Sequence, residues 1–175
     1  MKKITINDNN LKDEDIESKV IRVKGLIINS RGKILLAHNN NTFQFPGGHL
    51  EDNEDMDSCI KREIKEETGI DVKLKETAFL CIETYDNNYF NTGKKVLNSI
   101  YYYRFFTDDM PNFNETHYDE LEMATDFNLF YIPFNDLGNF LKKGIEDCKI
   151  DTAIGREMLN VFEVYKDLYG EEIVK

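Results

Sequence analysis

The sequence predicts an α/β protein: an α/β/α sandwich built on a mixed β-sheet, with an amphipathic helix at its C-terminus. Two observations predict this class. Runs rich in β-branched and aromatic residues are interleaved with helical segments, an order that favours helices on the faces of one sheet. Between residues 151 and 169, apolar side chains recur at helical spacing, at Ile154, Met158, Val161, Phe162 and Tyr165. We expect this last helix to pack on the same domain.

The first half of the chain predicts four strands and one long helix. The strands are expected at residues 2–6, 20–28, 33–37 and 43–45. Residues 7–19 are polar and acidic, which is typical of a loop or a weak helix. The helix is expected to begin after Asp55, a favourable N-cap, and to end at Gly69, which suits the left-handed residue after a helix. Its apolar residues recur every four positions, at Met56, Ile60 and Ile64.

The second half predicts three more strands and two helices. The strands are expected at residues 72–85, 96–107 and 128–132, joined by a loop at 86–95 and by an acidic, irregular connection at 108–126. Asn135 or Asp136 is expected to cap a short helix that runs through Leu141. The amphipathic helix then completes the chain.

Composition limits the classes of function. The 175 residues fit one domain, and the formal charge of −11 argues against non-specific binding to nucleic acid or to anionic membranes. The N-terminus lacks the apolar stretch of a secretory signal and no window is apolar enough to span a membrane, so we expect a cytoplasmic protein. Cys59, Cys81 and Cys148 are odd in number and far apart, which favours free buried thiols.

Three carboxylates provide the strongest chemical signal. Glu63, Glu66 and Glu67 lie at positions i, i+3 and i+4 of the expected helix and therefore project from one side of it. Like charges this close repel unless a cation neutralises them, and oxygen ligands suit a hard divalent ion such as Mg²⁺ or Mn²⁺. The alternative is a solvated acidic helix face with Lys61 and Lys65 as partners.

The residues around these carboxylates resemble the Nudix box, GX5EX7REUXEEXGU, in which U is aliphatic. Residues 48–70 read GHLEDNEDMDSCIKREIKEETGI, and every fixed position of the pattern is filled. The fixed and aliphatic positions are Gly48, Glu54, Arg62, Glu63, Ile64, Glu66, Glu67, Gly69 and Ile70. The lead-in FPGG at 45–48 and the segment LFYIPFNDL at 129–137 are also similar to that family. The resemblance implies an N-terminal extension at 1–19, a Nudix hydrolase domain at 20–141 and a C-terminal helical part at 142–175.

The resemblance also implies roles for individual residues. In this family the glutamates of the REUXEE segment hold divalent ions, so Glu63, Glu66 and Glu67 are the expected metal ligands, with the carbonyl of Gly48 as an additional candidate. Arg62 is expected to orient these carboxylates, with Glu54 tying the preceding loop to it. Arg62 and Glu54 could instead be an ordinary surface ion pair of little energetic value.

The implied reaction is hydrolysis of a nucleoside diphosphate linked to another group, with Mg²⁺ or Mn²⁺ as cofactor and water as nucleophile. The general base is a box glutamate in some members, here Glu63 first and Glu66 as the other candidate, and a glutamate of a later loop in others. Of Glu115, Glu120 and Glu122, we favour the last two because they are nearest the final strand and share a face when extended.

The substrate stays open at this point. Nucleoside triphosphates, dinucleoside polyphosphates and nucleotide sugars are the classes considered. Tyr85 faintly resembles a tyrosine found in this region of dinucleoside polyphosphate hydrolases. His49 and Phe45 are further candidates for substrate contact. Tyr101, Tyr102 and Tyr103 alternate along one strand, so one face joins the core and the tyrosine side chains on the other face could line a base pocket. The expected partner is a small nucleotide, and a homodimer stays open.

Other functions on the same fold are less favoured. A catalytically inactive nucleotide-binding or sensor module normally goes with a damaged REUXEE segment, and here the segment is complete. The sequence lacks the cysteine context and the tryptophan expected of an isomerase on this fold. RNA decapping is disfavoured by the acidic charge of the chain.

Overall fold

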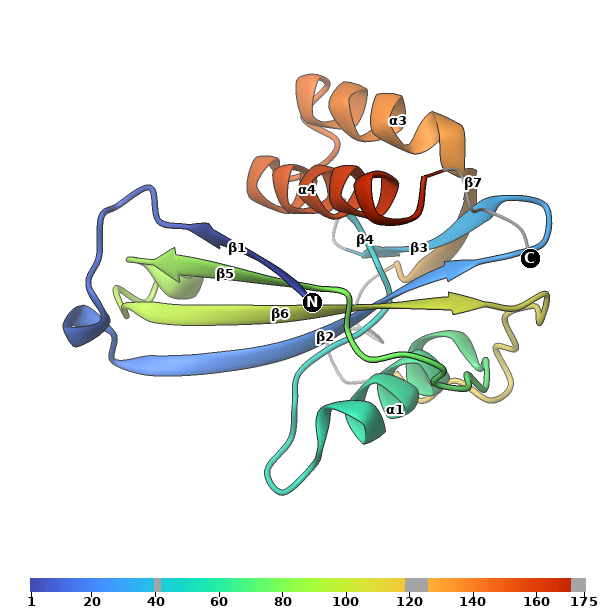
Figure 1. The fold of residues 1–175 in the computed structure, drawn as a ribbon, viewed down its shortest axis with the longest axis horizontal. Coiled ribbons are helices and arrows are strands. Elements are labelled where there is room, and N and C mark those ends of the chain that lie inside the picture. Colours follow the sequence, from blue (N-terminus) through green and yellow to red (C-terminus); the bar gives the residue numbers. More distant parts are fainter. Residues whose placement is uncertain (40–41, 119–125, 171–175) are drawn as a thin grey trace.

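A mixed β-sheet lies at the centre of the structure and draws its strands from most of the chain (Figure 1). The computed structural model describes residues 1–39, 42–118 and 126–170. Within these residues the sheet has seven strands in the order β1-β5-β6-β2-β3-β4, and β7 also pairs with β3. The strands are β1 (Lys2–Ile6), β2 (Ser18–Ile28), β3 (Lys33–Asn39), β4 (Thr42–Gln44), β5 (Leu80–Asp86), β6 (Val96–Phe106) and β7 (Asn128–Pro133). Strands β2 and β6 run parallel and β5 and β6 antiparallel, which makes the sheet mixed.

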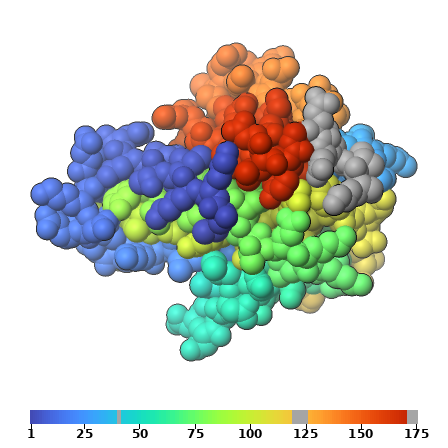
Figure 2. Space-filling view, in the orientation of Figure 1, coloured from blue at the N-terminus to red at the C-terminus, as the bar shows by residue number. Residues whose placement is uncertain are grey.

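Helices cover both faces of this sheet. Helix α1 (Met56–Thr68) lies on one face, and α3 (Phe134–Glu146) and α4 (Thr152–Tyr169) lie on the other (Figure 1). The space-filling view shows α1 and the loop before it projecting from the side opposite α3 and α4 (Figure 2). Two single 3-10 turns, η1 (Asp13–Asp15) and η2 (Tyr89–Asn91), lie in the connections. The expected α/β/α sandwich and C-terminal helix are confirmed.

Strand β2 shows why the sheet requires helices on both sides. Successive strand side chains point to opposite faces. Val23 and Ile27 therefore join the apolar cluster that contains Ile60 and Ile64 of α1. The alternate residues Leu26 and Ile28 join a second cluster, formed with α3 and α4. Both faces of β2 are buried, so the strand reads as the nearly continuous apolar run seen in the sequence.

The ends of α1 are fixed by the residues expected there. The Asp55 side chain accepts hydrogen bonds from the amides of Asp57 and Ser58 at 3.0 and 2.9 Å, which satisfies two donors that the first turn leaves unpaired. Gly69 adopts the left-handed conformation at φ 70°, and its amide donates to the Lys65 carbonyl at 2.8 Å.

Two boundaries in the second half differ from the expectation. The strand expected from residue 72 begins only at Leu80, because Val72 and Leu74 pack against the apolar cluster under α1 while the chain crosses to the sheet. The helix expected to be capped by Asn135 or Asp136 instead has Pro133 at its N-cap and places Asp136 in its first turn. It also continues beyond Leu141 to Glu146. Ile145 prolongs the apolar stripe of Leu137 and Leu141 by one turn, which explains the extension.

The N-terminal residues belong to the sheet. Strand β1 pairs in parallel with β5 at one edge, and only one 3-10 turn forms between β1 and β2. The division of the chain at residues 19 and 141 stays a prediction. Cys59 and Cys81 are buried free thiols as expected, whereas Cys148 is exposed because it lies in the turn between α3 and α4. Among the described residues, none of the helices combines the length and the apolar character needed to cross a membrane.

The C-terminus of α1 gives a direct test of this packing. Gly69→Ala should lower the free energy of unfolding by more than the roughly 1 kcal/mol expected for left-handed backbone strain alone. A Cβ at Gly69 would lie 2.2 Å from the Asn112 carbonyl oxygen, whereas a Cβ at Gly93, with a similar φ of 76°, would meet no atom within 4 Å. Gly93→Ala is therefore the matched control, and urea unfolding measures both. Equal losses would contradict the close approach of residue 112 to the helix end.

Candidate metal centre

Residues 46–50 lie along β2 and place two adjacent glycines against this strand. The amide of Val23 donates to the Gly48 carbonyl at 2.9 Å, and the amide of Gly25 donates to the Pro46 carbonyl at 2.8 Å. Gly47 has φ 139°, and a Cβ there would lie 2.1 Å from the Val23 carbonyl oxygen. Only glycine permits the chain to approach β2 this closely.

Two carboxylates of α1 contact these glycines. A Cβ on Gly48 would lie 2.3 Å from Glu63 Oε2, so the Glu63 carboxylate occupies the space beside the Gly48 backbone. Glu67 Oε2 accepts a hydrogen bond from the Gly47 amide at 2.9 Å, and the Glu67 residue is only 4% exposed. The C-terminal half of α1 is thus joined to the glycine segment through charged oxygen atoms.

Arg62 connects three carboxylates, those of Glu54, Glu63 and Glu66. Its Nε and Nη2 donate to both oxygens of Glu54 at 2.9 and 2.8 Å, a two-pronged ion pair. Its Nη1 donates to Glu63 and to Glu66, each at 2.9 Å. Its Nη2 also donates to the His49 carbonyl at 3.1 Å. A planar, permanently charged guanidinium can serve all these acceptors at once, which a lysine cannot do.

These contacts change the acidity of both partners. The hydrogen bond from Arg62, together with its charge, lowers the pKa of Glu54 below the ordinary value of 4.5 despite the opposing effect of burial. The hydrogen bond to Glu54 raises the pKa of Arg62, with further contributions from Glu63 and Glu66. The Glu54–Arg62 pair is therefore ionised at neutral pH.

The donor set fits a hard divalent cation. Glu54, Glu63, Glu66 and Glu67 carry four formal negative charges and Arg62 one positive charge, which leaves an excess of three negative charges. All the candidate ligands are oxygen atoms, as Mg²⁺ and Mn²⁺ prefer. The Gly48 carbonyl already accepts from Val23, but a carbonyl oxygen has two lone pairs and can also bind a cation.

The carboxylates do not yet converge in this structure. In the part of the chain that is described, no three Asp, Glu, His or Cys side chains meet in an arrangement that could hold a metal ion. The hydrogen bonds explain this result, because Arg62 holds Glu63 and Glu66 while Glu67 is bonded to Gly47. Among Glu54, Glu63 and Glu66, which Arg62 contacts, Glu66 has the most exposed side chain, at 35%.

A comparison with known protein families identifies the family of this chain. A model of the NUDIX domain family matches residues 19–149. The chain belongs to the Nudix family. Among the fixed positions of the Nudix box, Gly48, Glu63 and Glu67 lie where α1 meets the glycine segment.

Solved structures support the same fold. The solution structure of the E. coli ORF135 protein aligns with a TM-score of 0.56 and 15% identity over 93% of this chain and 98% of that one. The crystal structure of a MutT protein from Methanosarcina mazei Go1 aligns with a TM-score of 0.54 and 19% identity over 83% and 93%. At these identities the likeness concerns the fold alone.

One curated relative matches over a short segment. An 8-oxo-dGTP diphosphatase from Proteus vulgaris is 50% identical over 38 residues, which is 22% of this chain and 34% of that protein. The chain thus covers about a third of the length of this relative.

The three residues expected to contact substrate lie in different places. His49 lies beside Arg62, which donates to its carbonyl, and the His49 Nε2 accepts a hydrogen bond from Arg22 Nε at 2.9 Å. Phe45 is fully buried on the α4 side of the sheet, with its ring 6.3 Å from that of Tyr102. Tyr85 lies on β5, and its hydroxyl donates to Asp13 of the N-terminal turn at 2.6 Å. The structure therefore brings only His49 to the box.

The acidic connection after β6 is attached to the C-terminus of α1. The amide of Asn112 donates to the Thr68 carbonyl and that of His117 to the Glu66 carbonyl, each at 2.9 Å. Glu115 forms an ion pair with Lys65 and accepts from the Asn112 side chain. The other two candidate bases, Glu120 and Glu122, lie outside the described residues.

Some residues at the site gave no signal in the sequence. His117 is placed at the Glu66 turn only by backbone contacts between segments far apart in the chain, so no local pattern could reveal it. Arg22 is a single basic residue within a strand and belongs to no motif, yet it contacts His49. Strand alternation predicts only that the side chains of Arg22 and Lys24 lie on the same face of β2, and it does not predict the contact with His49.

The Glu54–Arg62 pair predicts a specific dependence of stability on pH. Because the pKa of Glu54 is lowered in the folded state, its contribution to stability is present above about pH 4.5 and is lost as the pH falls through its folded-state value. Glu54→Gln should reduce the free energy of unfolding at pH 7, and the difference from wild type should shrink below pH 4.5. Glu51→Gln is the control, since Glu51 is 4.0 Å from Arg62 with a side chain 70% exposed. Urea unfolding across this pH range is the measurement, and a constant difference would contradict the assignment.

Proposed function

We propose that the protein is a Mg²⁺- or Mn²⁺-dependent hydrolase that cleaves a phosphoanhydride bond in a nucleoside diphosphate linked to another group. The observation that carries the proposal is the junction of α1 with the glycine segment. There the Glu63 carboxylate lies against Gly48, Glu67 is bonded to Gly47, and Arg62 holds Glu63 and Glu66. Membership of the Nudix family supports this chemistry.

Each residue of the junction has a proposed part in the reaction. Glu63, Glu66 and Glu67 are the metal ligands, and the Gly48 carbonyl is an additional one. A bound divalent ion supplies charge neutralisation on the phosphate oxygens and lowers the pKa of water. Arg62 is a positioning residue that keeps the carboxylates together, and Glu54 fixes the guanidinium from the opposite side.

Nucleoside triphosphates are the first substrate class to test. The short match to an 8-oxo-dGTP diphosphatase supports this order, although it covers about a third of that protein. Dinucleoside polyphosphates and nucleotide sugars follow. The engagement of the Tyr85 hydroxyl with Asp13 does not favour the polyphosphate class for which Tyr85 was the indication.

The general base is proposed to come from the acidic connection. The backbone bond between His117 and Glu66 brings the chain beside the carboxylates immediately before residues 119–125, which supports a role for Glu120 or Glu122. Glu115 is less suited because its carboxylate already pairs with Lys65. If neither Glu120 nor Glu122 acts, the base lies in the box, with Glu63 as the first candidate.

Metal dependence is the main prediction. Hydrolysis of dGTP or another member of these classes should stop after chelation and return with Mg²⁺ or Mn²⁺. Glu66→Gln and Glu67→Gln should each remove most of kcat, because the amide keeps the volume of the side chain and loses its charge. Glu163→Gln on α4, an exposed glutamate on the opposite face, is the control and should match wild type.

A measurement independent of turnover accompanies this test. Metal at a hundredfold excess over Kd should stabilise wild type by about 2.7 kcal/mol, seen as a rise in Tm. The shift should be much smaller for Glu66→Gln and Glu67→Gln and unchanged for Glu163→Gln. Undiminished turnover after exhaustive chelation would refute the metal mechanism.

Single variants identify the base. Glu120→Gln or Glu122→Gln should lower kcat and remove its rise with pH, because the group that accepts the proton from water is gone. Glu115→Gln should leave the pH profile unchanged, since that carboxylate serves the contact with Lys65. Activity restored by excess metal would instead identify the residue as a ligand. Wild-type profiles in all three variants would move the base to Glu63.

A further inference from the structure

The turn between β5 and β6 presents an exposed aromatic side chain that is linked to the candidate centre through Arg22 and His49. Phe90 is 72% exposed, and its ring lies 4.4 Å from that of Tyr89, centroid to centroid. A single exposed phenylalanine is ordinary on a protein surface. Phe90 differs from an ordinary exposed phenylalanine because hydrogen bonds and a strained backbone fix the turn that carries it.

The backbone of this turn is strained and firmly hydrogen-bonded. Phe90 and Asn91 have φ values of 47° and 59°, in the left-handed region that bulky side chains avoid. The Asn88 side chain accepts from the Gly93 amide at 2.9 Å, and the Tyr89 amide donates to the Lys94 carbonyl at 3.0 Å. Backbone strain of this kind persists only when surrounding contacts maintain it, and it is frequent at ligand-binding sites.

A chain of hydrogen bonds runs from this turn to the carboxylates. Arg22 Nη2 donates to the Tyr89 hydroxyl and Arg22 Nε donates to His49 Nε2, both at 2.9 Å. The guanidinium carbon of Arg22 is 5.9 Å from the centre of the Phe90 ring. The His49 carbonyl in turn accepts from Arg62. The aromatic turn is thus tied through two residues to the group that holds Glu63 and Glu66.

The chemistry of this surface suits one end of a nucleotide. Phe90 offers a flat apolar face, and stacking on aromatic side chains is how proteins hold bases without reading their edges. Arg22 adds a positive charge in a chain whose formal charge is −11, which favours an anionic ligand at this place.

We propose that the Phe90 ring is the stacking surface for the base of the bound nucleotide. Arg22 and Tyr89 are positioning residues that hold the turn in place. The assignment rests on the proposed hydrolase function for the phosphate end and adds the location of the base.

Binding of products that cannot be hydrolysed tests the assignment without catalysis. Calorimetric titration with dGMP in the presence of Mg²⁺ should show about a tenfold higher Kd for Phe90→Ala than for wild type. Phe90→Leu, which keeps apolar volume but has no stacking face, should fall between them. Ribose 5-phosphate has no base, so its Kd should be the same in all variants. In turnover, Phe90→Ala should raise KM for dGTP and leave kcat unchanged.

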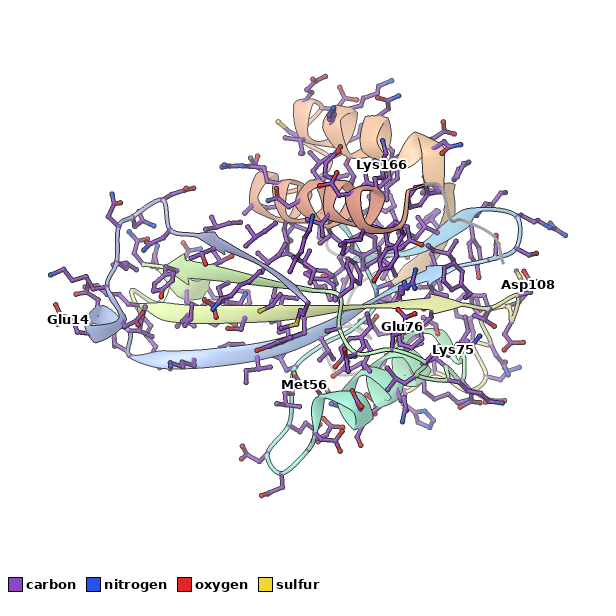
Figure 3. The ribbon with its side chains drawn as sticks, viewed as in Figure 1. Glu14, Met56, Lys75, Glu76, Asp108 and Lys166 are labelled. Carbon is purple, nitrogen blue, oxygen red and sulfur yellow. The ribbon has the colours of Figure 1, made fainter. Side chains whose placement is uncertain are left out.

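A matched control lies at the other end of β6. Phe106 is also exposed, and the guanidinium of Arg104 is 5.7 Å from its ring. The sheet end labelled by Asp108 in Figure 3 is the end near Phe106, and the β5–β6 turn lies towards the opposite end, labelled by Glu14. Phe106→Ala should bind dGMP like wild type. Equal dGMP affinity in Phe90→Ala and wild type, or equal losses in Phe90→Ala and Phe106→Ala, would overturn the proposal.

The outcomes also separate this proposal from the hydrolase function. If no nucleotide is hydrolysed but dGMP binding depends on Phe90, the stacking surface stands and the hydrolase proposal fails. If hydrolysis is metal-dependent and KM is indifferent to Phe90, the hydrolase proposal stands and the stacking surface fails.

Discussion

The approach of α1 to the Gly47–Gly48 segment is the constraint on which the rest of the structure depends. A Cβ at Gly47 would collide with the Val23 carbonyl, and one at Gly48 would collide with the Glu63 carboxylate. Strand β2 and the glycine segment therefore meet without side-chain volume between them, and only the Glu63 and Glu67 carboxylates separate this segment from α1. Because Val23 also packs under α1 while its neighbours on β2 face α4, this contact fixes the helix relative to the whole core.

The same contact concentrates negative charge on the α1 face of an already acidic protein. An anionic substrate gains nothing from the overall field of a chain with a formal charge of −11. Arg62 offsets only part of the local repulsion and is itself held by Glu54, so it organises the carboxylates and leaves the excess in place. A divalent cation at this place would cancel two of the three excess negative charges and would itself offer a positive charge to a phosphate group.

The parts of this arrangement that could be predicted from sequence are those encoded locally. Asp55 and Gly69 mark the helix ends because capping depends on a few adjacent residues, and the spacing of Glu63, Glu66 and Glu67 follows from helix geometry. The burial of Phe45 depends instead on its register against β2, which no local pattern gives. The late start of β5 at Leu80 and the contact of Tyr85 with Asp13 likewise depend on distant segments. Glu120 and Glu122 lie outside the described residues, so their part in the site stays a prediction.

Cys59 places a thiol against Arg62, beside the carboxylates of the candidate centre. Its Sγ donates to the His49 carbonyl at 3.3 Å, on the same backbone group that receives Arg62. Burial, together with the hydrogen bond and charge of Glu54, raises the pKa of this thiol to about 12, so it is protonated at neutral pH. Soft metals bind the thiolate, and a protonated thiol is a poor ligand. At neutral pH the Cys59 thiol is therefore a poor ligand, which leaves the carboxylate oxygens as the candidate metal ligands of the centre.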